Sequence, residues 1–104
     1  MAVVTSDSGK LVADVFASPV RGVNTMRLHV TDTGGHPVDG LGLSVTPWMP
    51  SHAHGTSVIP IVTATGNGNY VVSELDLFMP GRWQIRVSVM TPSTDAFVPV
   101  LDVP

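Results

Sequence analysis

Residues 48–55, "WMPSHAHG", hold the side chains of this sequence that are best suited to binding chemistry. His52 and His54, two of only four histidines, lie one residue apart and close to Met49. In an extended segment, residues i and i+2 point to the same side, about 6.6 to 7 Å apart at Cα. His52 and His54 can therefore offer two imidazoles to one metal ion. Flanking proline and glycine predict a loop, where binding residues are often found.

A second methionine-proline pair lies much later in the chain, in "LFMPGRW", between two predicted strands. Both pairs fall at strand ends, and a β-sandwich gathers its strand ends at two poles, so Met79 and the histidine loop can meet. Within the loop, Pro50 is expected to stiffen the chain and Gly55 to let it turn away. The histidines are the predicted principal ligands, and the methionines are additional soft ones. The complete predicted set is Met49, His52, His54 and Met79.

The donor types in this set indicate which metal it would bind. Imidazole suits copper, zinc, nickel and iron, whereas thioether sulfur favours Cu(I). Zinc sites usually add cysteine or carboxylate, and calcium and magnesium require several oxygens. The chain has no cysteine, and no carboxylate flanks the loop. The set therefore predicts copper, as Cu(I), Cu(II) or both. The competing interpretation from spacing alone is an exposed turn, with methionines that fill gaps in the core.

Alternation of apolar and polar residues predicts the strands that position this loop. It is clearest in "TMRLHVT", "GLGLSVT" and "RWQIRVSVM". Weaker candidates are "KLVADVFA" near the start and "DAFVPVLDV" at the end, where a proline indicates an edge strand. "SVIPIVTAT" and "NYVVSELDL" flank "GNG", which predicts a hairpin with positive φ at its tip. No stretch shows a helical period.

About seven short strands predict an all-β fold, an antiparallel sandwich of two sheets. A chain of 104 residues fits one domain spanning residues 1–104. Trp83 is expected between the sheets, with Met26 also in the core. His29 faces away from the apolar side of its strand and His36 lies in a turn, so both are expected at the surface.

Composition narrows the class of protein. Hydrophobic residues make up 43% and charged residues 12%, which argues against disorder. The net charge is −3 without a basic cluster, so nucleic acid and anionic lipid are unexpected partners. No apolar run is long enough to span a bilayer. The first residues lack the pattern of a signal peptide, and a leader or anchor removed from the chain would leave no trace in it.

Catalytic patterns are missing from the sequence. It contains no G-x-S-x-G elbow, no pair of neighbouring carboxylates and no glycine-rich phosphate loop that opens a helix. We therefore expect a protein that is not an enzyme.

Several motifs resemble those of a known family. They are "GVNTMRLHVTDTGGHPVDG", "MPSHAHG" and "GNYVVSELDLFMPGRWQIRVSV". From Val20 to Val89, about two thirds of the chain, the sequence resembles the YtkA-like domain family, which is related to the FixH proteins. The family pattern of a D-x-x-G-x-P-V turn, an MP-x-x-x-H-G-type loop, G-x-Y and M-x-G-x-W appears in order. Its segments are Asp32 to Val38, Met49 to Gly55, Gly68 to Tyr70 and Met79 to Trp83.

The resemblance implies a fold, a cellular location, a function and a partner for this chain. Domains of this family are immunoglobulin-like sandwiches on the outer side of bacterial membranes, commonly linked to copper handling or to assembly of haem-copper oxidases. It implies a periplasmic or extracellular location, with a membrane anchor in the full-length protein. It also implies a membrane copper protein or an oxidase subunit as partner. Ser51 and Ala53 stand where relatives often have further methionine, so this loop has less sulfur.

Two functions from different classes follow. The first is a copper-binding module that carries, buffers or delivers copper outside the cytoplasm. The alternative is a metal-free immunoglobulin-like interaction domain of a membrane-associated assembly.

Overall fold

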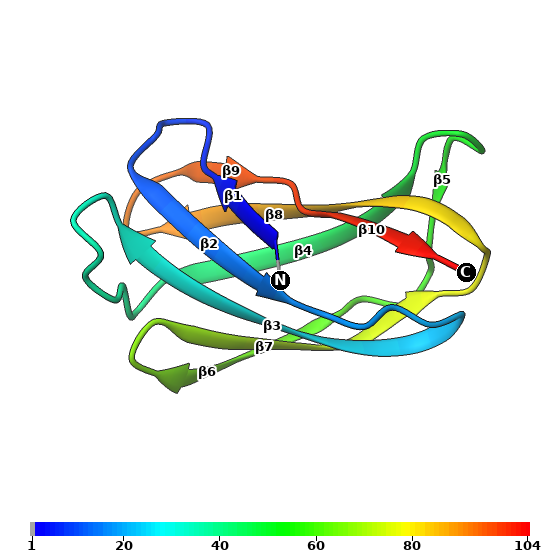
Figure 1. Cartoon of the computed structure of the whole chain (residues 1–104), viewed down its shortest axis with the longest axis horizontal. Coiled ribbons are helices and arrows are strands. Elements are labelled where there is room, and N and C mark those ends of the chain that lie inside the picture. The colour runs from blue at the N-terminus through cyan, green and yellow to red at the C-terminus, as the bar shows by residue number, and fades with distance from the viewer. Residues whose placement is uncertain (1) are drawn as a thin grey trace.

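The chain folds as two antiparallel β-sheets that pack face to face, as a computed structural model shows (Figure 1). The structure describes residues 2–104, so Met1 of the predicted domain lies outside it. The first sheet has the order β1-β2-β3-β7-β6 and the second β10-β8-β4-β5, with β9 also paired to β8. The strands are β1 (Ala2–Thr5), β2 (Leu11–Phe16), β3 (Gly22–Asp32), β4 (Gly42–Met49), β5 (His54–Gly55), β6 (Ile61–Gly66), β7 (Asn69–Leu77), β8 (Gly81–Thr91), β9 (Asp95–Phe97) and β10 (Val100–Val103).

The two sheets meet through the apolar faces that alternation predicts. On β3, Met26, Leu28 and Val30 are fully buried, while the residues between them face outward. On β8, every second residue from Trp83 to Val89 is buried. Trp83 has no exposed surface, which confirms its predicted place between the sheets. The all-β sandwich predicted from the sequence is confirmed.

The structure has more strands than the seven predicted. β1 lies outside every predicted run, and β5 is only two residues long. The last predicted strand splits into β9 and β10, because Pro99 has no N–H to donate to β8. The carbonyl of Pro99 still accepts a hydrogen bond from the Ile85 N–H at 2.8 Å.

The hairpin between β6 and β7 has the predicted backbone conformation at its tip. Gly66, Asn67 and Gly68 all have positive φ, at 93°, 53° and 76°. Glycine and asparagine tolerate this conformation at little steric cost, so the local sequence sets the turn.

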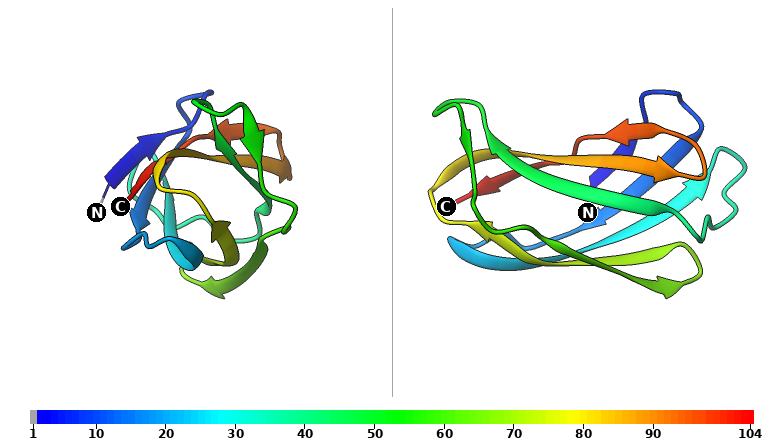
Figure 2. Two further views of the ribbon diagram at one scale, coloured as in Figure 1. Left: turned by 90° about the vertical axis from the view of Figure 1, so that its right-hand side faces the viewer. Right: turned by 180° about the vertical axis from the view of Figure 1, so that it is seen from behind.

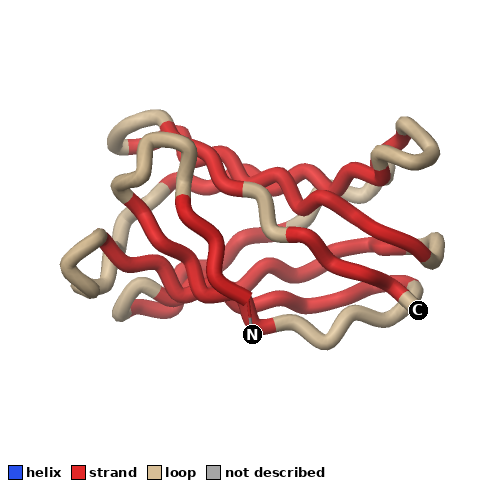
Figure 3. Tube along the Cα trace, turned by 45° about the horizontal axis from the view of Figure 1, so that its top comes forward, coloured by secondary structure: helices blue, strands red, loops and turns tan. Residues whose placement is uncertain are grey.

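Loops and turns gather at the two ends of the elongated sandwich, which measures 36 × 24 × 23 Å (Figure 3). One end carries the loop between β4 and β5, the turn between β7 and β8, and the C-terminus (Figure 2, right). The chain then crosses this end from β5 in one sheet to β6 in the other. Within residues 2–104, no helix has the length and apolarity needed to cross a membrane.

Candidate metal centre

The histidine loop is a tight hairpin between β4 and β5. Met49 pairs with His54 across it, and Trp48 pairs with Gly55. The His52 N–H donates to the Met49 carbonyl at 3.2 Å, and the Ala53 N–H donates to the Pro50 carbonyl at 3.2 Å. Ala53 has a φ of 51°, in the left-handed region. The expectation of an extended segment is therefore wrong here, because these two hydrogen bonds fold the chain back between the histidines.

Gly55 has a different role from the one predicted. A Cβ atom at this position would lie 2.9 Å from the Pro47 carbonyl oxygen. Glycine therefore lets β5 approach β4 closely, and the change of direction comes earlier, at Ala53.

The fold nevertheless brings the two imidazoles together. The ring centroids of His52 and His54 are 5.6 Å apart, with 33° between the ring planes. A metal–nitrogen bond of about 2.0 to 2.1 Å puts a ring centre about 3.2 Å from the ion, so two rings on one ion lie at most about 6.4 Å apart. The observed separation lies within that limit. The distance between the rings is therefore compatible with two imidazoles on one ion.

The His54 ring contacts two aromatic side chains, one in the turn between β7 and β8 and one on β8. Its ring stacks on Phe78 at 5.4 Å and meets the edge of Trp83 at 6.0 Å. Phe78 and Trp83 also contact each other, with centroids 5.6 Å apart. The turn that contains Met79 therefore lies beside the histidine loop, and the predicted meeting of these strand ends is confirmed.

A backbone hydrogen bond selects the tautomer of His54. Its Nδ1 lies 3.1 Å from the carbonyl oxygen of Gly55. A carbonyl only accepts, so Nδ1 carries the hydrogen and donates it. In the neutral ring the lone pair is then on Nε2, which is the arrangement that a metal-binding histidine needs.

The two methionines are placed differently from the histidines. Met49 is fully buried and part of the hydrophobic core, close enough to Gly81 that a Cβ there would lie 3.2 Å from the Met49 Cε. Met79 is half-buried and packs against the core, and its carbonyl accepts a hydrogen bond from Trp83 Nε1 at 3.0 Å. Both methionines lie near the loop, and their role as ligands stays a prediction.

The described part of the chain has no cluster of the side chains that hard metal ions prefer. Within residues 2–104 no three His, Cys, Asp or Glu side chains lie close enough to hold a metal ion together. A metal at this loop would have the two imidazoles as its nitrogen ligands, with the thioether sulfurs of Met49 and Met79 as the predicted additional donors. These neutral, soft donors fit Cu(I) better than zinc, calcium or magnesium.

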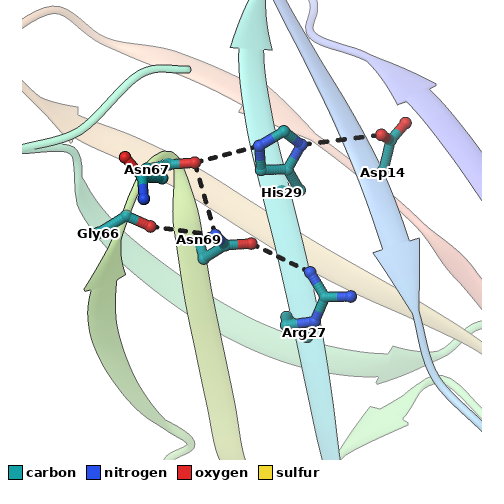
Figure 4. Close-up of polar contacts among 6 residues, drawn as sticks. All are labelled: Asp14, Arg27, His29, Gly66, Asn67 and Asn69. Carbon is teal, nitrogen blue, oxygen red and sulfur yellow. Dashed lines mark hydrogen bonds and ion pairs between the residues drawn. The ribbon is translucent and has the colours of Figure 1, made fainter.

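The other two histidines lie at the surface, as predicted. His29 is on the outer face of the first sheet, where Nε2 donates to the Asn67 carbonyl at 3.1 Å and Nδ1 lies 3.9 Å from Asp14 (Figure 4). His36 lies in an exposed turn, and its backbone N–H is the main cause of the lowered pKa of Asp32. Each ring has one carboxylate neighbour and no second histidine, so neither resembles the loop.

Phe78 is the site residue that sequence analysis missed. It packs on His54 from a turn that lies more than twenty residues later in the chain, and its exposed fraction is 43%. An aromatic residue next to Met79 in "LFMPGRW" was the available signal. This aromatic residue does not predict a contact by itself, because the partner of a turn residue depends on which loops lie at the same end of the sandwich.

Residues 4–88 match the family model described as YtkA-like, which is well over half of the chain. The chain belongs to the YtkA-like family. The fold of this YtkA-like chain is also similar to that in a crystal structure of the Lin-41 filamin domain. The TM-score is 0.58 at 13% identity, over 88% of this chain and 91% of that one. This likeness supports an immunoglobulin-like sandwich and nothing more specific. Comparison with curated proteins yields no significant match.

Proposed function

We propose that this YtkA-like chain is a copper-binding module that carries, buffers or delivers copper outside the cytoplasm, without catalysis of its own. The observation that supports it best is the pair of imidazoles in the hairpin, with centroids 5.6 Å apart. His54 contributes Nε2, because its Nδ1–H is engaged by Gly55. His52, which is exposed, supplies the second nitrogen from the solvent side.

The aromatic neighbours of His54 prepare it for binding. Phe78 and Trp83 restrict the ring, so less side-chain entropy is lost when His54 coordinates an ion. Sulfur from Met79, and from Met49 on the core side, would favour the Cu(I) state. Bound copper would supply a soft cation that can be passed to a ligand set of higher affinity, such as that of a membrane copper protein or an oxidase subunit.

The test is a titration with Cu(I) and Cu(II) against a competing chelator. The variant is the double substitution His52→Ala/His54→Ala, and the matched control is His29→Ala/His36→Ala, which removes the two surface histidines. Met49→Leu and Met79→Leu measure the sulfur contribution separately. We expect the loop variant to lose at least about tenfold in affinity, about 1.4 kcal/mol, and the control to retain it.

Two further readouts depend on the donor types. Copper should outcompete zinc, because thioether sulfur does not favour zinc. Binding through imidazole should weaken on acidification, since protons compete with metal for the ring nitrogens. Unchanged copper affinity in the loop variant would reject the proposal and favour a metal-free interaction domain. Binding of zinc as tight as copper would reject the sulfur contribution alone.

A further inference from the structure

Charged residues avoid one continuous part of this chain. Residues 40–73 contain no Asp, Glu, Lys or Arg, although the chain has thirteen such residues in total. This uncharged stretch includes β4, β5, β6 and the first half of β7. The net charge of −3 is therefore carried entirely by the rest of the molecule.

β6 is the outer strand of the first sheet within this stretch. Among the strands of residues 2–104 it pairs with β7 alone, and it forms the lower margin of the sandwich (Figure 1). With six residues it is longer than β1, β5 and β10, which end the sheets elsewhere. β4 is also unpaired on one side before Trp48, because β5 pairs only with Trp48 and Met49, but β4 has Pro47 within it. In an antiparallel pair, alternate residues of an edge strand direct their N–H and C=O groups outward, where they can pair with another strand.

The usual protection of a sheet edge is weak on β6. Edge strands are commonly blocked by a charged side chain, a proline or a bulge. β10 has such protection, because its Asp102 carries a charge and pairs with Arg82. β6 has neither a charge nor a proline within it, and its one irregularity lies near its end, between Ala64 and Gly66. Its first four residues therefore present an open edge.

Apolar side chains accompany this edge. Ile61, the first residue of β6, is 55% exposed, and Ile59, just before it, is 83% exposed. Both are large aliphatic residues, and covering them would add to the stabilisation from strand pairing.

We propose that β6 pairs antiparallel with β6 of a second copy of this chain, which joins two five-stranded sheets into one. Antiparallel pairing of two identical strands is two-fold symmetric, so the same edge serves both partners. A second copy also meets this edge without like-charge repulsion, because neither β6 carries charge. The residues that carry the net charge of −3 all lie outside residues 40–73, so none of that charge lies on either β6.

The size of the contact predicts a weak dimer. Stable interfaces commonly bury about 1,600 Å² in total, and one short strand edge covers less than that. We therefore expect association in the micromolar range or weaker, and a population that rises with protein concentration. The pairing does not depend on metal, so it is independent of the proposed copper site.

The first test is sedimentation velocity over a concentration range from about 1 µM to about 1 mM, with a metal chelator present to exclude bridging by metal. Thr63 lies within the first four residues of β6, the part proposed to pair. In a two-fold pairing of these residues, Thr63→Lys places the two introduced charges close together, because paired strands lie only about 4.7 to 4.9 Å apart. Ser88→Lys is the matched control, since it adds the same charge at an exposed position in the middle of the other sheet. We expect wild type and Ser88→Lys to dimerise and Thr63→Lys to remain monomeric.

The absence of native cysteine allows a second test of the contact itself. Under mild oxidation, Thr63→Cys should form a disulfide-linked dimer faster than Ser88→Cys. A monomer at every concentration would overturn the proposal. So would a dimer that Thr63→Lys does not weaken, or equal crosslinking rates for the two cysteine variants.

Discussion

Replacement of Trp83 tests the core and the support of the site together. The indole is fully buried, and its Nε1–H donates to the Met79 carbonyl at 3.0 Å. Trp83→Phe keeps a ring in the core but removes roughly 40 Å² of apolar surface, about 1 kcal/mol. It also removes the part-buried hydrogen bond to the Met79 carbonyl, a net loss of about 1 to 2 kcal/mol. The expected total is about 2 to 3 kcal/mol of the free energy of unfolding.

The matched control is Trp48→Phe, the same chemical change at the other tryptophan. Trp48 is half-buried on the outer face of β4, where the Arg86 guanidinium lies 5.1 Å from its ring centre. A cation–π contact at such a site contributes about 0.5 to 1 kcal/mol, and phenylalanine retains part of it. We therefore expect Trp48→Phe to cost less than about 1 kcal/mol.

The assay is urea unfolding followed by far-UV circular dichroism, since tryptophan fluorescence would change with the substitutions themselves. With a slope of about 1 to 3 kcal/mol per molar urea, Trp83→Phe should lower the midpoint by about 0.7 to 3 M. The larger change Trp83→Ala should cost about 3 to 5 kcal/mol, near the limit of what a domain of this size tolerates. Equal losses for Trp83→Phe and Trp48→Phe would refute the argument, because only one indole is enclosed.

Two further predictions concern the hairpin tip and acid stability. A Cβ at Gly68 would lie 2.5 Å from the Val30 carbonyl oxygen, whereas one at Gly66 meets no atom within 4 Å, and both have positive φ. Gly68→Ala should therefore cost about 2 kcal/mol or more and Gly66→Ala about 1 kcal/mol, measured by thermal unfolding. Hydrogen bonds from Ser8 lower the pKa of Asp95 from 3.8 to about 2, so their stabilisation is present above about pH 4 and lost as pH falls towards 2. The urea midpoint of Asp95→Asn should fall less over that range than that of wild type.

Each of these two predictions has a clear contrary result. Equal losses for the two alanine variants would show that the hairpin tip moves away from Val30 at low cost. For the acid range, Asp7→Asn in the same loop region is the control, because Asp7 accepts none of the hydrogen bonds that hold Asp95. An acid response that Asp7→Asn alters as much as Asp95→Asn would contradict the assignment to Asp95.

The faces of the strands were predictable because alternation is a local property. A residue on a strand points to the side opposite its neighbour, so apolar residues at every second position must share the buried face. This rule placed Met26 and Trp83 in the core and His29 on the outer face, and the structure agrees. The positive φ values at the "GNG" tip were predictable for a similar reason, since glycine and asparagine adopt them at little cost.

The ends of strands were harder to predict because they depend on pairing. Whether a run pairs continuously is decided by the neighbouring strand, and Pro99 interrupts the pairing with β8 where alternation alone continues. β1 and β5 exist because β2 and β4 offer them an edge, which no local pattern reports.

The sequence by itself determined that two imidazoles belong to one short loop, because only one residue separates His52 from His54. The tertiary structure alone decided how they are held. The direction of a side chain at a strand end depends on the register of the hairpin, and the observed register points the Met49 side chain into the core. Contact between His54 and Phe78 depends on two connections that meet at one end of the sandwich, although they are distant in the chain. Local spacing carries no information about such a meeting, because packing of the two sheets produces it.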